Sequence, residues 1–306
     1  MCDKQVASQV FDIERFAIHD GPGIRTVVFL QGCPLRCPWC ANPESWTTKP
    51  QLMHIALKCV GCGACAAACP QGAIVMEESR PHINRTLCTA CGTCAETCPP
   101  EVMRISGRRM NVDEIMVVIA KDADYYKTSG GGVTLSGGEP LMQIDGAAEL
   151  LTACREAGFH TAVETTGNVP VEDFARAMPL VDLFLFDYKH HDAGTLRNIT
   201  GGDLPLIWRN LETLVQSAPE KLILRIPVIP GFNADEGTVL EMLTQARKLG
   251  VTAVTLLPYH SLGQNKFEQL GMVYRHQTDV LMLGEKDLEP FRTLGAAIGM
   301  EVKIGG

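Results

Sequence analysis

Short apolar segments rich in β-branched residues alternate along this chain with longer segments whose apolar positions recur at helical spacing. The short segments predict β-strands at residues 25–30, 133–135, 161–164, 183–186, 222–226 and 253–257. The longer segments predict helices at about 145–157, 206–216, 235–249 and 285–297. Asn111, with Glu114 three positions on, predicts the start of another helix. Strands that alternate with helices indicate an α/β fold with a parallel sheet.

A cysteine-rich stretch interrupts this alternation between the first and second predicted strands. We therefore expect an α/β core whose N-terminal part covers residues 1–49, an insertion at 50–107, and the rest of the core at 108–306. The chain has 306 residues, which is long enough for such a core, and its composition (46% hydrophobic, 20% charged) is typical of a globular protein.

Charge and hydropathy argue against several classes of partner. The formal net charge is −8, which disfavours nucleic acid and anionic membrane as the main partner. No apolar run approaches the roughly 18 residues of a membrane span. Charged residues also interrupt the N-terminus where a signal peptide is apolar. We expect a cytoplasmic, monomeric protein.

The 13 cysteines are too many for a cytoplasmic chain to hold as disulfides, and their spacing indicates metal clusters. The pattern C-x2-C-x2-C-x3-C-P occurs twice. It is the bacterial ferredoxin run, in which three cysteines bind one [4Fe–4S] cluster and the fourth binds the other. The two predicted ligand sets are Cys59, Cys62, Cys65 and Cys98, and Cys88, Cys91, Cys94 and Cys69. Two zinc sites are the alternative, but they leave the x3-C-P tail unexplained.

A third group, Cys33, Cys37 and Cys40 in GCPLRCPWC, has no fourth cysteine nearby. Three thiolates on a four-iron cluster leave one iron open, and an open metal position is typical of a site that binds substrate. The alternatives are a zinc ion held by three cysteines, or a cluster completed by a distant ligand such as His54 or Cys154. Cys154 falls on the apolar stripe of a predicted helix, where a buried thiol is the simpler interpretation.

Polar and glycine residues follow the predicted strands at their C-terminal ends. They are the cysteines of 33–40, SGGEP at 136–140, ETTG at 164–167, DYK at 187–189, Arg225, and Tyr259 with His260. In βα barrels the loops at this end of the strands converge on the active site. The sequence therefore predicts that these residues meet in one site.

Each of these groups suits a chemical task and also has a simpler explanation. Gly137 and Gly138 let backbone approach a ligand, and Glu139 suits an ammonium group, but the glycines also suit a tight turn. Oxygens for a cation or for ribose hydroxyls are offered by Glu164, Thr165 and Asp187. Lys189 can pair with a carboxylate in the site, or it can form an ordinary solvated salt bridge. His260 is either a ligand contact or a core histidine.

Two further features lie beside these groups. Arg225 alternates with apolar neighbours, so we expect it to point into the barrel towards an anion or a carboxylate. The segment DGPGIR predicts a fixed turn that presents Asp20 and Arg25, or only punctuates a hairpin. The glycines at 130–132 predict another turn.

Together these motifs resemble the radical S-adenosylmethionine (SAM) superfamily, and within it the activating enzymes of glycyl radical enzymes. The segments that carry the resemblance are HDGPGIRTVVFLQGCPLRCPWCANPES, the double ferredoxin run, TSGGGVTLSGGEP, VETTG, FDYK, RIPVIPGFNADE and LLPYHSLG. The resemblance implies an incomplete (β/α)6 TIM-like barrel with an inserted bacterial ferredoxin-like domain. It also implies three [4Fe–4S] clusters, of which one binds SAM.

The resemblance assigns roles residue by residue. Cys33, Cys37 and Cys40 would hold the SAM-cleaving cluster, and Asp20 would lie near an incoming glycine loop. The implied SAM contacts are Trp39, Gly137, Gly138, Glu139, Glu164, Thr165, Asp187, Lys189, Arg225 and His260. A monovalent cation is implied beside Glu164 and Asp187.

The implied activity is oxidoreductase chemistry on a protein. Flavodoxin or ferredoxin would supply an electron, SAM would be cleaved to methionine and a 5′-deoxyadenosyl radical, and that radical would take a Cα hydrogen from a glycine of the partner enzyme. The partner would resemble choline lyase, glycerol or diol dehydratase, arylacetate decarboxylase or formate-acetyltransferase-like enzymes, and the sequence selects none of them. A radical SAM enzyme for a small molecule and a non-catalytic iron–sulfur electron carrier are the alternatives.

Overall fold

The computed structural model describes residues 6–276 and 281–305, so Cys2 lies outside the described residues. A mixed, nine-stranded sheet forms the body of the molecule, in the order β13-β12-β11-β10-β9-β8-β2-β1-β7. Its strands are β1 (Ala7–Ala17), β2 (Arg25–Leu30), β7 (Arg108–Asn111), β8 (Gly132–Gly137), β9 (His160–Thr165), β10 (Leu183–Asp187), β11 (Leu222–Val228), β12 (Ala253–Pro258) and β13 (Glu301–Ile304).

Most of this sheet is parallel, as the sequence predicts. All neighbouring strands from β2 through β8, β9, β10, β11 and β12 to β13 pair in parallel. The six predicted strands are β2 and β8 to β12, each with the predicted core and small differences at the ends. The sheet also contains β13, and β1 and β7 extend it in antiparallel pairing beyond β2. Among the described residues β13 and β7 do not pair, so the barrel is incomplete.

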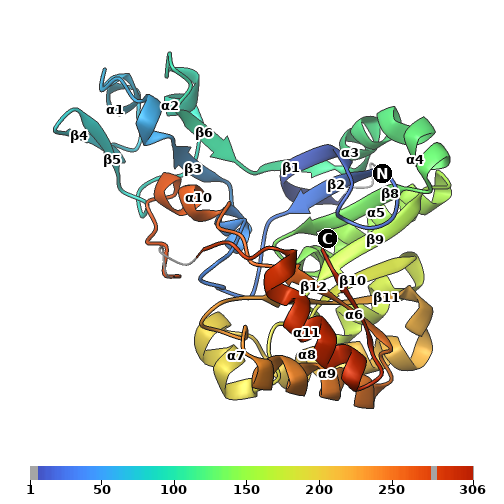
Figure 1. Cartoon of the computed structure of the whole chain (residues 1–306). Helices are drawn as coiled ribbons and strands as arrows, with labels where there is room; N and C mark the ends of the chain where they lie inside the picture. Colours follow the sequence, from blue (N-terminus) through green and yellow to red (C-terminus); the bar gives the residue numbers. More distant parts are fainter. Residues whose placement is uncertain (1–5, 277–280, 306) are drawn as a thin grey trace.

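Helices follow the strands and pack on one face of the sheet (Figure 1). They are α3 (Val112–Ile119), α4 (Ala123–Ser129), α5 (Ile144–Glu156), α6 (Val171–Ala177), α7 (Ala193–Thr200), α8 (Leu204–Ser217), α9 (Glu236–Leu249) and α11 (Glu285–Ala297). A further helix, α10 (Gln264–Gln269), lies away from this face and contacts residues 51–54 of the cysteine-rich stretch. The predicted start of α3 is confirmed, because Asn111 Oδ1 accepts from Glu114 N at 2.9 Å and Glu114 Oε2 accepts from Asn111 N at 2.8 Å. The apolar core lies between these helices and the sheet.

The cysteine-rich stretch between β2 and β7 forms a small unit that projects from this body (Figure 1). It contains β3 (Gln51–His54), α1 (Ala64–Ala67), β4 (Ile74–Glu77), β5 (Arg80–Ile83), α2 (Thr93–Glu96) and β6 (Met103–Ser106). β3 pairs with β6 and β4 pairs with β5, both antiparallel. The unit has its own cluster of buried side chains, which includes Leu52, Ile74 and Val102.

Short 3-10 turns complete the described elements. They are η1 (Pro43–Trp46), η2 (Ala56–Lys58), η3 (Ala120–Asp122), η4 (Pro140–Gln143), η5 (Met178–Leu180) and η6 (Pro219–Lys221). Within the described ranges, none of the helices has both the length and the apolar character that a bilayer crossing requires.

Candidate active site

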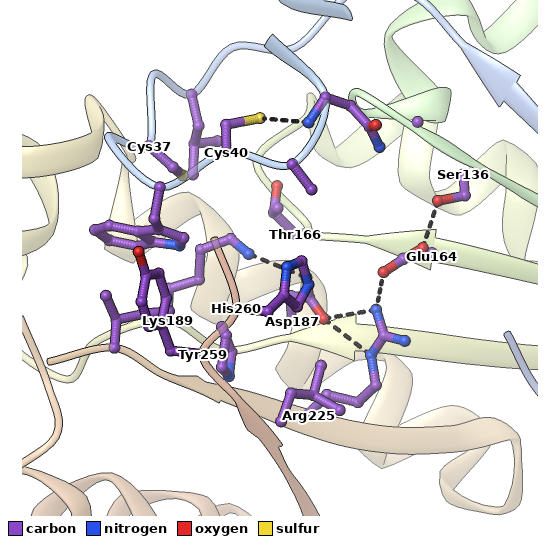
Figure 2. Close-up of a pocket in the computed structure, with 18 of the residues that line it drawn as sticks. Cys37, Cys40, Ser136, Glu164, Thr166, Asp187, Lys189, Arg225, Tyr259 and His260 are labelled. Atoms are coloured by element: carbon purple, nitrogen blue, oxygen red, sulfur yellow. Dashed lines mark hydrogen bonds and ion pairs between the residues drawn. The ribbon is translucent and has the colours of Figure 1, made fainter. Parts of the chain in front are cut away.

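A cavity of about 690 Å³ opens at the carboxyl ends of the parallel strands (Figure 2). Side chains from the loops after β2, β8, β9, β10, β11 and β12 line it, so the predicted convergence of strand ends is found in the structure. The predicted residues that line it are Asp20, Cys33, Cys37, Trp39, Cys40, Gly137, Gly138, Glu164, Thr165, Asp187, Lys189, Arg225 and His260. Among the residues predicted to contact SAM, Glu139 is the one that does not line it.

The loop after β2 holds the three cysteines against one side of the cavity. Arg36 fixes the loop, since its Nη1 donates to the carbonyl oxygens of Cys33 at 2.6 Å and Leu35 at 2.7 Å. The Asn42 backbone N–H donates to Cys40 Sγ at 3.4 Å. Burial raises the pKa of the Cys37 thiol to about 12, so the thiolate form needs a cation bound to it.

No further cysteine of the described residues lines the cavity. His54 lies on β3, in the projecting unit, and Cys154 is fully buried on α5. Neither lines the cavity, so the alternative in which one of them completes the ligand set gains no support. Three thiols that share one cavity with polar side chains fit a cluster with one open iron, as the spacing predicts.

A charged network faces the cysteines across the cavity (Figure 2). Arg225 Nη2 contacts Glu164 Oε1 and lies 2.8 Å from Asp187 Oδ1. Lys189 Nζ lies 3.0 Å from Asp187 Oδ2. Ser136 Oγ donates to the second oxygen of Glu164. These contacts confirm that Arg225 points inward onto carboxylates.

Burial and charge act in opposite directions on this network. Burial alone would raise the pKa of Asp187, but the Arg225 and Lys189 charges outweigh it and lower that pKa. Burial lowers the pKa of Lys189, but the Asp187 charge more than restores it, so the pKa lies above its ordinary value. Asp187, Lys189 and Arg225 are therefore charged together at neutral pH.

Glu139 is placed behind the cavity and stabilises its wall. Its carboxylate accepts from Thr165 Oγ1, from the Thr166 backbone N–H and from Thr166 Oγ1, each at 2.8 Å. Burial raises the pKa of Glu139, although these hydrogen bonds act against the shift. The structure thus gives Glu139 partners within the protein instead of a free oxygen towards the cavity. It binds the SGGEP loop to the loop after β9.

The glycines of SGGEP are needed for close packing against the cysteine loop. A Cβ on Gly138 would lie 2.2 Å from the Gly32 carbonyl oxygen and 3.2 Å from Cys33 Cβ. Gly137 has φ +110°, which side-chain-bearing residues rarely adopt. The tight-turn explanation is therefore confirmed, and the turn brings this backbone to the cavity wall.

The DGPGIR turn lies at one side of the cavity and presents Asp20 but not Arg25. Arg25 is fully buried, and its Nε donates to Thr134 Oγ1 at 2.6 Å while its Nη2 donates to the Val133 carbonyl at 2.7 Å. Thr134 Oγ1 in turn donates to the Asp20 carbonyl at 2.7 Å. The expectation that the turn presents both residues was therefore wrong for Arg25, which anchors the turn from inside.

The glycines at 130–132 hold this turn in place. A Cβ on Gly131 would lie 1.8 Å from the Ile24 carbonyl oxygen, and a Cβ on Gly23, which has φ +68°, would lie 2.4 Å from the Gly131 nitrogen. We expect Gly131→Ala to lower thermal stability by about 1–3 kcal/mol through overpacking against backbone. Gly194→Ala is the control, since its nearest contact is the Asp192 carboxylate at 3.4 Å. Equal melting temperatures for both variants would contradict this account.

The Asp20 carboxyl makes the stability of the protein depend on pH, and replacement of Asp20 by asparagine removes that dependence. Burial, with the nearby Glu164 charge, raises the pKa of Asp20 to about 6, although Arg225 opposes the shift. The folded protein then retains a proton that the unfolded chain releases, so stability decreases from about pH 4 to pH 6. We expect Asp20→Asn to melt at a higher temperature than the parent at pH 7.5. The difference should shrink at pH 5, and a pH-independent difference would contradict the assignment.

Trp39 and His260 lie on the remaining sides of the cavity. The Trp39 ring packs against Phe232 with centroids 4.6 Å apart, which fixes the indole beside the cysteines. Partial burial lowers the pKa of His260, so the imidazole is neutral at pH 7.

Asn233 is a site-building residue that the sequence reasoning did not single out. It is fully buried, and its Nδ2 donates to the carbonyl oxygens of Lys189 and Pro227, both at 2.8 Å. It thereby joins the loop after β10, which carries Lys189, to strand β11, which carries Arg225. Its position in the motif RIPVIPGFNADE could have indicated this role, because an asparagine in a turn commonly forms hydrogen bonds with nearby backbone groups.

The projecting unit contains two small cavities, each lined by four cysteines. Cys59, Cys62, Cys65 and Cys98 line the first. Cys69, Cys88, Cys91 and Cys94 line the second. Each set takes three cysteines from one run and one from the other, which are the sets that the spacing predicts. Within residues 6–276 and 281–305, no three His, Cys, Asp or Glu side chains are arranged to hold a single metal ion.

Comparison with known proteins agrees with this geometry. Residues 27–243, which include the cysteine loop and the strand ends up to Arg225, match the family described as the Radical SAM superfamily. The chain belongs to the radical SAM superfamily.

Relatives define this radical SAM protein further. It is 40% identical to the indoleacetate decarboxylase activating enzyme of Tractidigestivibacter scatoligenes, over 89% of this chain and 90% of that protein. It is 37% identical to the 4-hydroxyphenylacetate decarboxylase activating enzyme of Clostridioides difficile (strain 630), over 99% and 97%. The choline trimethylamine-lyase activating enzyme of Oleidesulfovibrio alaskensis is 39% identical, over 92% of each chain. The prediction of a radical SAM activating enzyme is confirmed.

Proposed function

We propose that this radical SAM enzyme generates a 5′-deoxyadenosyl radical from SAM and uses it to remove a Cα hydrogen from one glycine of a partner enzyme. The observation that carries the proposal is the single cavity that Cys33, Cys37 and Cys40 share with the Arg225 network, with Asp20 beside them. A glycine has no side chain to hinder the approach of the radical. The products would be 5′-deoxyadenosine and a glycine-centred radical in the partner.

The three cysteines fit the [4Fe–4S] cluster that this chemistry requires. They lie in one loop, share one cavity and have no fourth cysteine beside them in the cavity lining. When bound there, the cluster supplies the electron that breaks the 5′ carbon–sulfur bond of SAM. Arg36 holds the loop that presents the thiols, and the Asn42 N–H provides a hydrogen bond to Cys40 Sγ.

The remaining lining residues would bind and orient SAM. The backbone at Gly137 and Gly138 would approach the methionyl amino group, and the buried Arg225 and Lys189 would attract its carboxylate. The predicted monovalent cation would have to share Glu164 and Asp187 with these two side chains, because both carboxylates are already paired. Trp39 and His260 lie where they would exclude water from the bound nucleoside.

The projecting unit would carry two further [4Fe–4S] clusters and form a ferredoxin-like insertion at residues 50–107. The two cavities with four cysteines each support this, because each takes its fourth cysteine from the other run. The two clusters would relay electrons from flavodoxin or ferredoxin to the SAM-cleaving cluster. Docking of the reductant and stabilisation of the insertion are the alternative roles.

The partner would be a glycyl radical enzyme, but its substrate is not selected by these observations. The relatives named above activate two decarboxylases and a lyase, and their identities to this chain span only 37% to 40%. Those relatives align over 89% to 99% of this chain, and each is named as the activating enzyme of another enzyme. This favours a protein substrate over a small-molecule substrate.

The test is an anaerobic incubation of the reconstituted, reduced enzyme with SAM and candidate glycyl radical enzymes. We expect 5′-deoxyadenosine and an EPR signal of a glycine-centred radical, which alanine at the partner's target glycine abolishes. SAM cleavage without a radical on any partner would favour a small-molecule substrate. Fully iron-loaded enzyme that neither cleaves SAM nor radicalises a partner would favour the electron carrier.

A further inference from the structure

Glu44 and Lys266 form an ion pair behind the cysteine loop, outside the Arg225 network and outside the cavity lining. Glu44 lies in η1 directly after the cysteines and is 3% exposed. Lys266 lies on α10, far away in the sequence, and its Nζ is 2.7 Å from Glu44 Oε1. None of the roles described above uses this pair.

The pair is connected to the cluster site by two hydrogen bonds. Lys266 Nζ also donates to Asn42 Oδ1 at 2.8 Å. The backbone N–H of Asn42 donates to Cys40 Sγ at 3.4 Å. Hydrogen bonds to cluster sulfurs and nearby charge are among the means by which proteins set the reduction potential of an iron–sulfur cluster. A donor and a positive charge stabilise the reduced, more negative state.

The surrounding contacts hold this arrangement independently of the charges. A Cβ on Gly263, immediately before α10, would lie 2.4 Å from the Cys40 carbonyl oxygen, so the helix begins in close contact with the cysteine loop. Trp46 and Phe267 pack edge to face with centroids 5.5 Å apart. The Gln51 side chain donates to the Glu44 carbonyl at 3.1 Å. Loss of the ion pair therefore leaves the helix and the loop packed together.

The same helix also contacts the projecting unit. Arg85 Nη2 donates to the carbonyl of Gln269, the last residue of α10, at 3.2 Å. One end of α10 thus touches the cysteine loop and the other end touches the unit with the eight further cysteines (Figure 1). The Lys266–Glu44 pair thus lies where the cysteine loop, α10 and the projecting unit meet.

Stability alone does not account for this pair. Glu44 Oε2 is buried without a hydrogen-bond partner among the described residues. The Lys266 side chain is 29% exposed, but the Glu44 side chain is only 4% exposed. Burying a carboxylate in an ion pair commonly adds no more to stability than an apolar side chain of similar volume, because the carboxylate loses its hydration. The Lys266–Glu44 pair therefore points to a role in the cysteine loop that it contacts.

We propose that the Lys266–Glu44 pair is a positioning device that fixes the Asn42 N–H on Cys40 and thereby raises the reduction potential of the SAM-cleaving cluster. The inference rests on the proposed function, because it requires a cluster on Cys40. Lys266 orients the Asn42 side chain, and Glu44 fixes the ammonium where it reaches both. Neither residue touches SAM.

The decisive variant replaces both charges by neutral side chains of similar size, Lys266→Met with Glu44→Gln, because Lys266→Met alone would leave a buried carboxylate unpaired. The measured quantity is the midpoint potential of the cluster, followed anaerobically by EPR. Only the cluster with an open iron should respond to S-adenosylhomocysteine, an analogue that is not cleaved, so the analogue-responsive part of the signal identifies it. Iron content and melting temperature are measured on the same samples.

We expect the double variant to keep its iron and to show a more negative potential. At a fixed potential its ratio of reduced to oxidised cluster should be about tenfold lower, as for other residues that support a metal ligand. Lys266→Arg, which keeps the donors, should recover most of the parent value. Glu268→Gln is the matched control, since it changes a charge on the exposed side of the same helix and should leave the potential unchanged.

Three outcomes would overturn the inference in distinguishable ways. An unchanged potential in an iron-loaded double variant would show that the pair is only structural. An equal shift in Glu268→Gln would show that any change of charge on α10 moves the potential, without a part for the Asn42 hydrogen bond. A parent protein with full iron but no analogue-responsive signal would overturn the proposed function itself, and this inference with it.

Discussion

Alanine at Cys33, Cys37 and Cys40 together should reduce 5′-deoxyadenosine formation from SAM on the order of a thousandfold or more, to background. The three thiols act as one unit on one cluster, so further single replacements add little to the first. Burial keeps these thiols from ionising on their own, and we expect the variant cavity to hold no iron. The triple variant should lose about four irons per molecule. The irons that we propose for the projecting unit should stay.

Cys154→Ala is the matched control for this experiment. Cys154 is also a fully buried thiol, but it lies on α5 beside Met116, away from the cavity. It should retain both iron content and SAM cleavage. If the triple variant kept the parent rate, SAM cleavage would not occur at this loop. If it also lost the irons that we propose for the projecting unit, the loss of activity would report a general failure of assembly.

The parallel part of the fold was predictable because its strands are buried on both faces. Segments such as 183–186 are continuous apolar runs, and their predicted limits agree closely with β10. β1 escaped prediction because charged residues alternate with apolar ones along ASQVFDIERFA, and much of the strand is exposed. β13 has only four residues, which is too short for periodicity to separate a strand from a turn.

The candidate site was predictable from where the strands end, but not the direction of each side chain. Glu139 directly follows Gly138, and Arg25 belongs to the same turn as Asp20. Gly138 and Asp20 line the cavity, yet the Glu139 and Arg25 side chains point into the protein and bind its loops. Neighbouring positions at a strand end face opposite sides, and a shift of one residue decides which one reaches the ligand. Long-range partners such as Lys266 for Glu44 leave no local pattern at all, since helical spacing relates only residues of the same helix.

Arg225→Met should destabilise the protein by about 3–5 kcal/mol, because it leaves buried carboxylates without their main counter-charge. Arg225 is 5% exposed and contacts Glu164 and Asp187, so the variant site would hold two carboxylates and only the Lys189 ammonium. The denaturation midpoint, measured anaerobically with guanidinium, should fall accordingly. SAM binding should weaken as well, because the remaining negative charge repels the methionyl carboxylate.

Two comparisons decide whether unpaired charge causes that loss. Arg176 also contacts two carboxylates, Asp145 at 2.7 Å and Asp173 at 3.7 Å, but its side chain is 50% exposed. Arg176→Met should therefore cost at most about 1 kcal/mol, since water screens an exposed pair. Adding Glu164→Gln to Arg225→Met removes the surplus negative charge and should restore part of the lost stability. If the double variant were less stable than Arg225→Met alone, lost packing and hydrogen bonds at Arg225 would be the cause, and the network would not depend on charge balance.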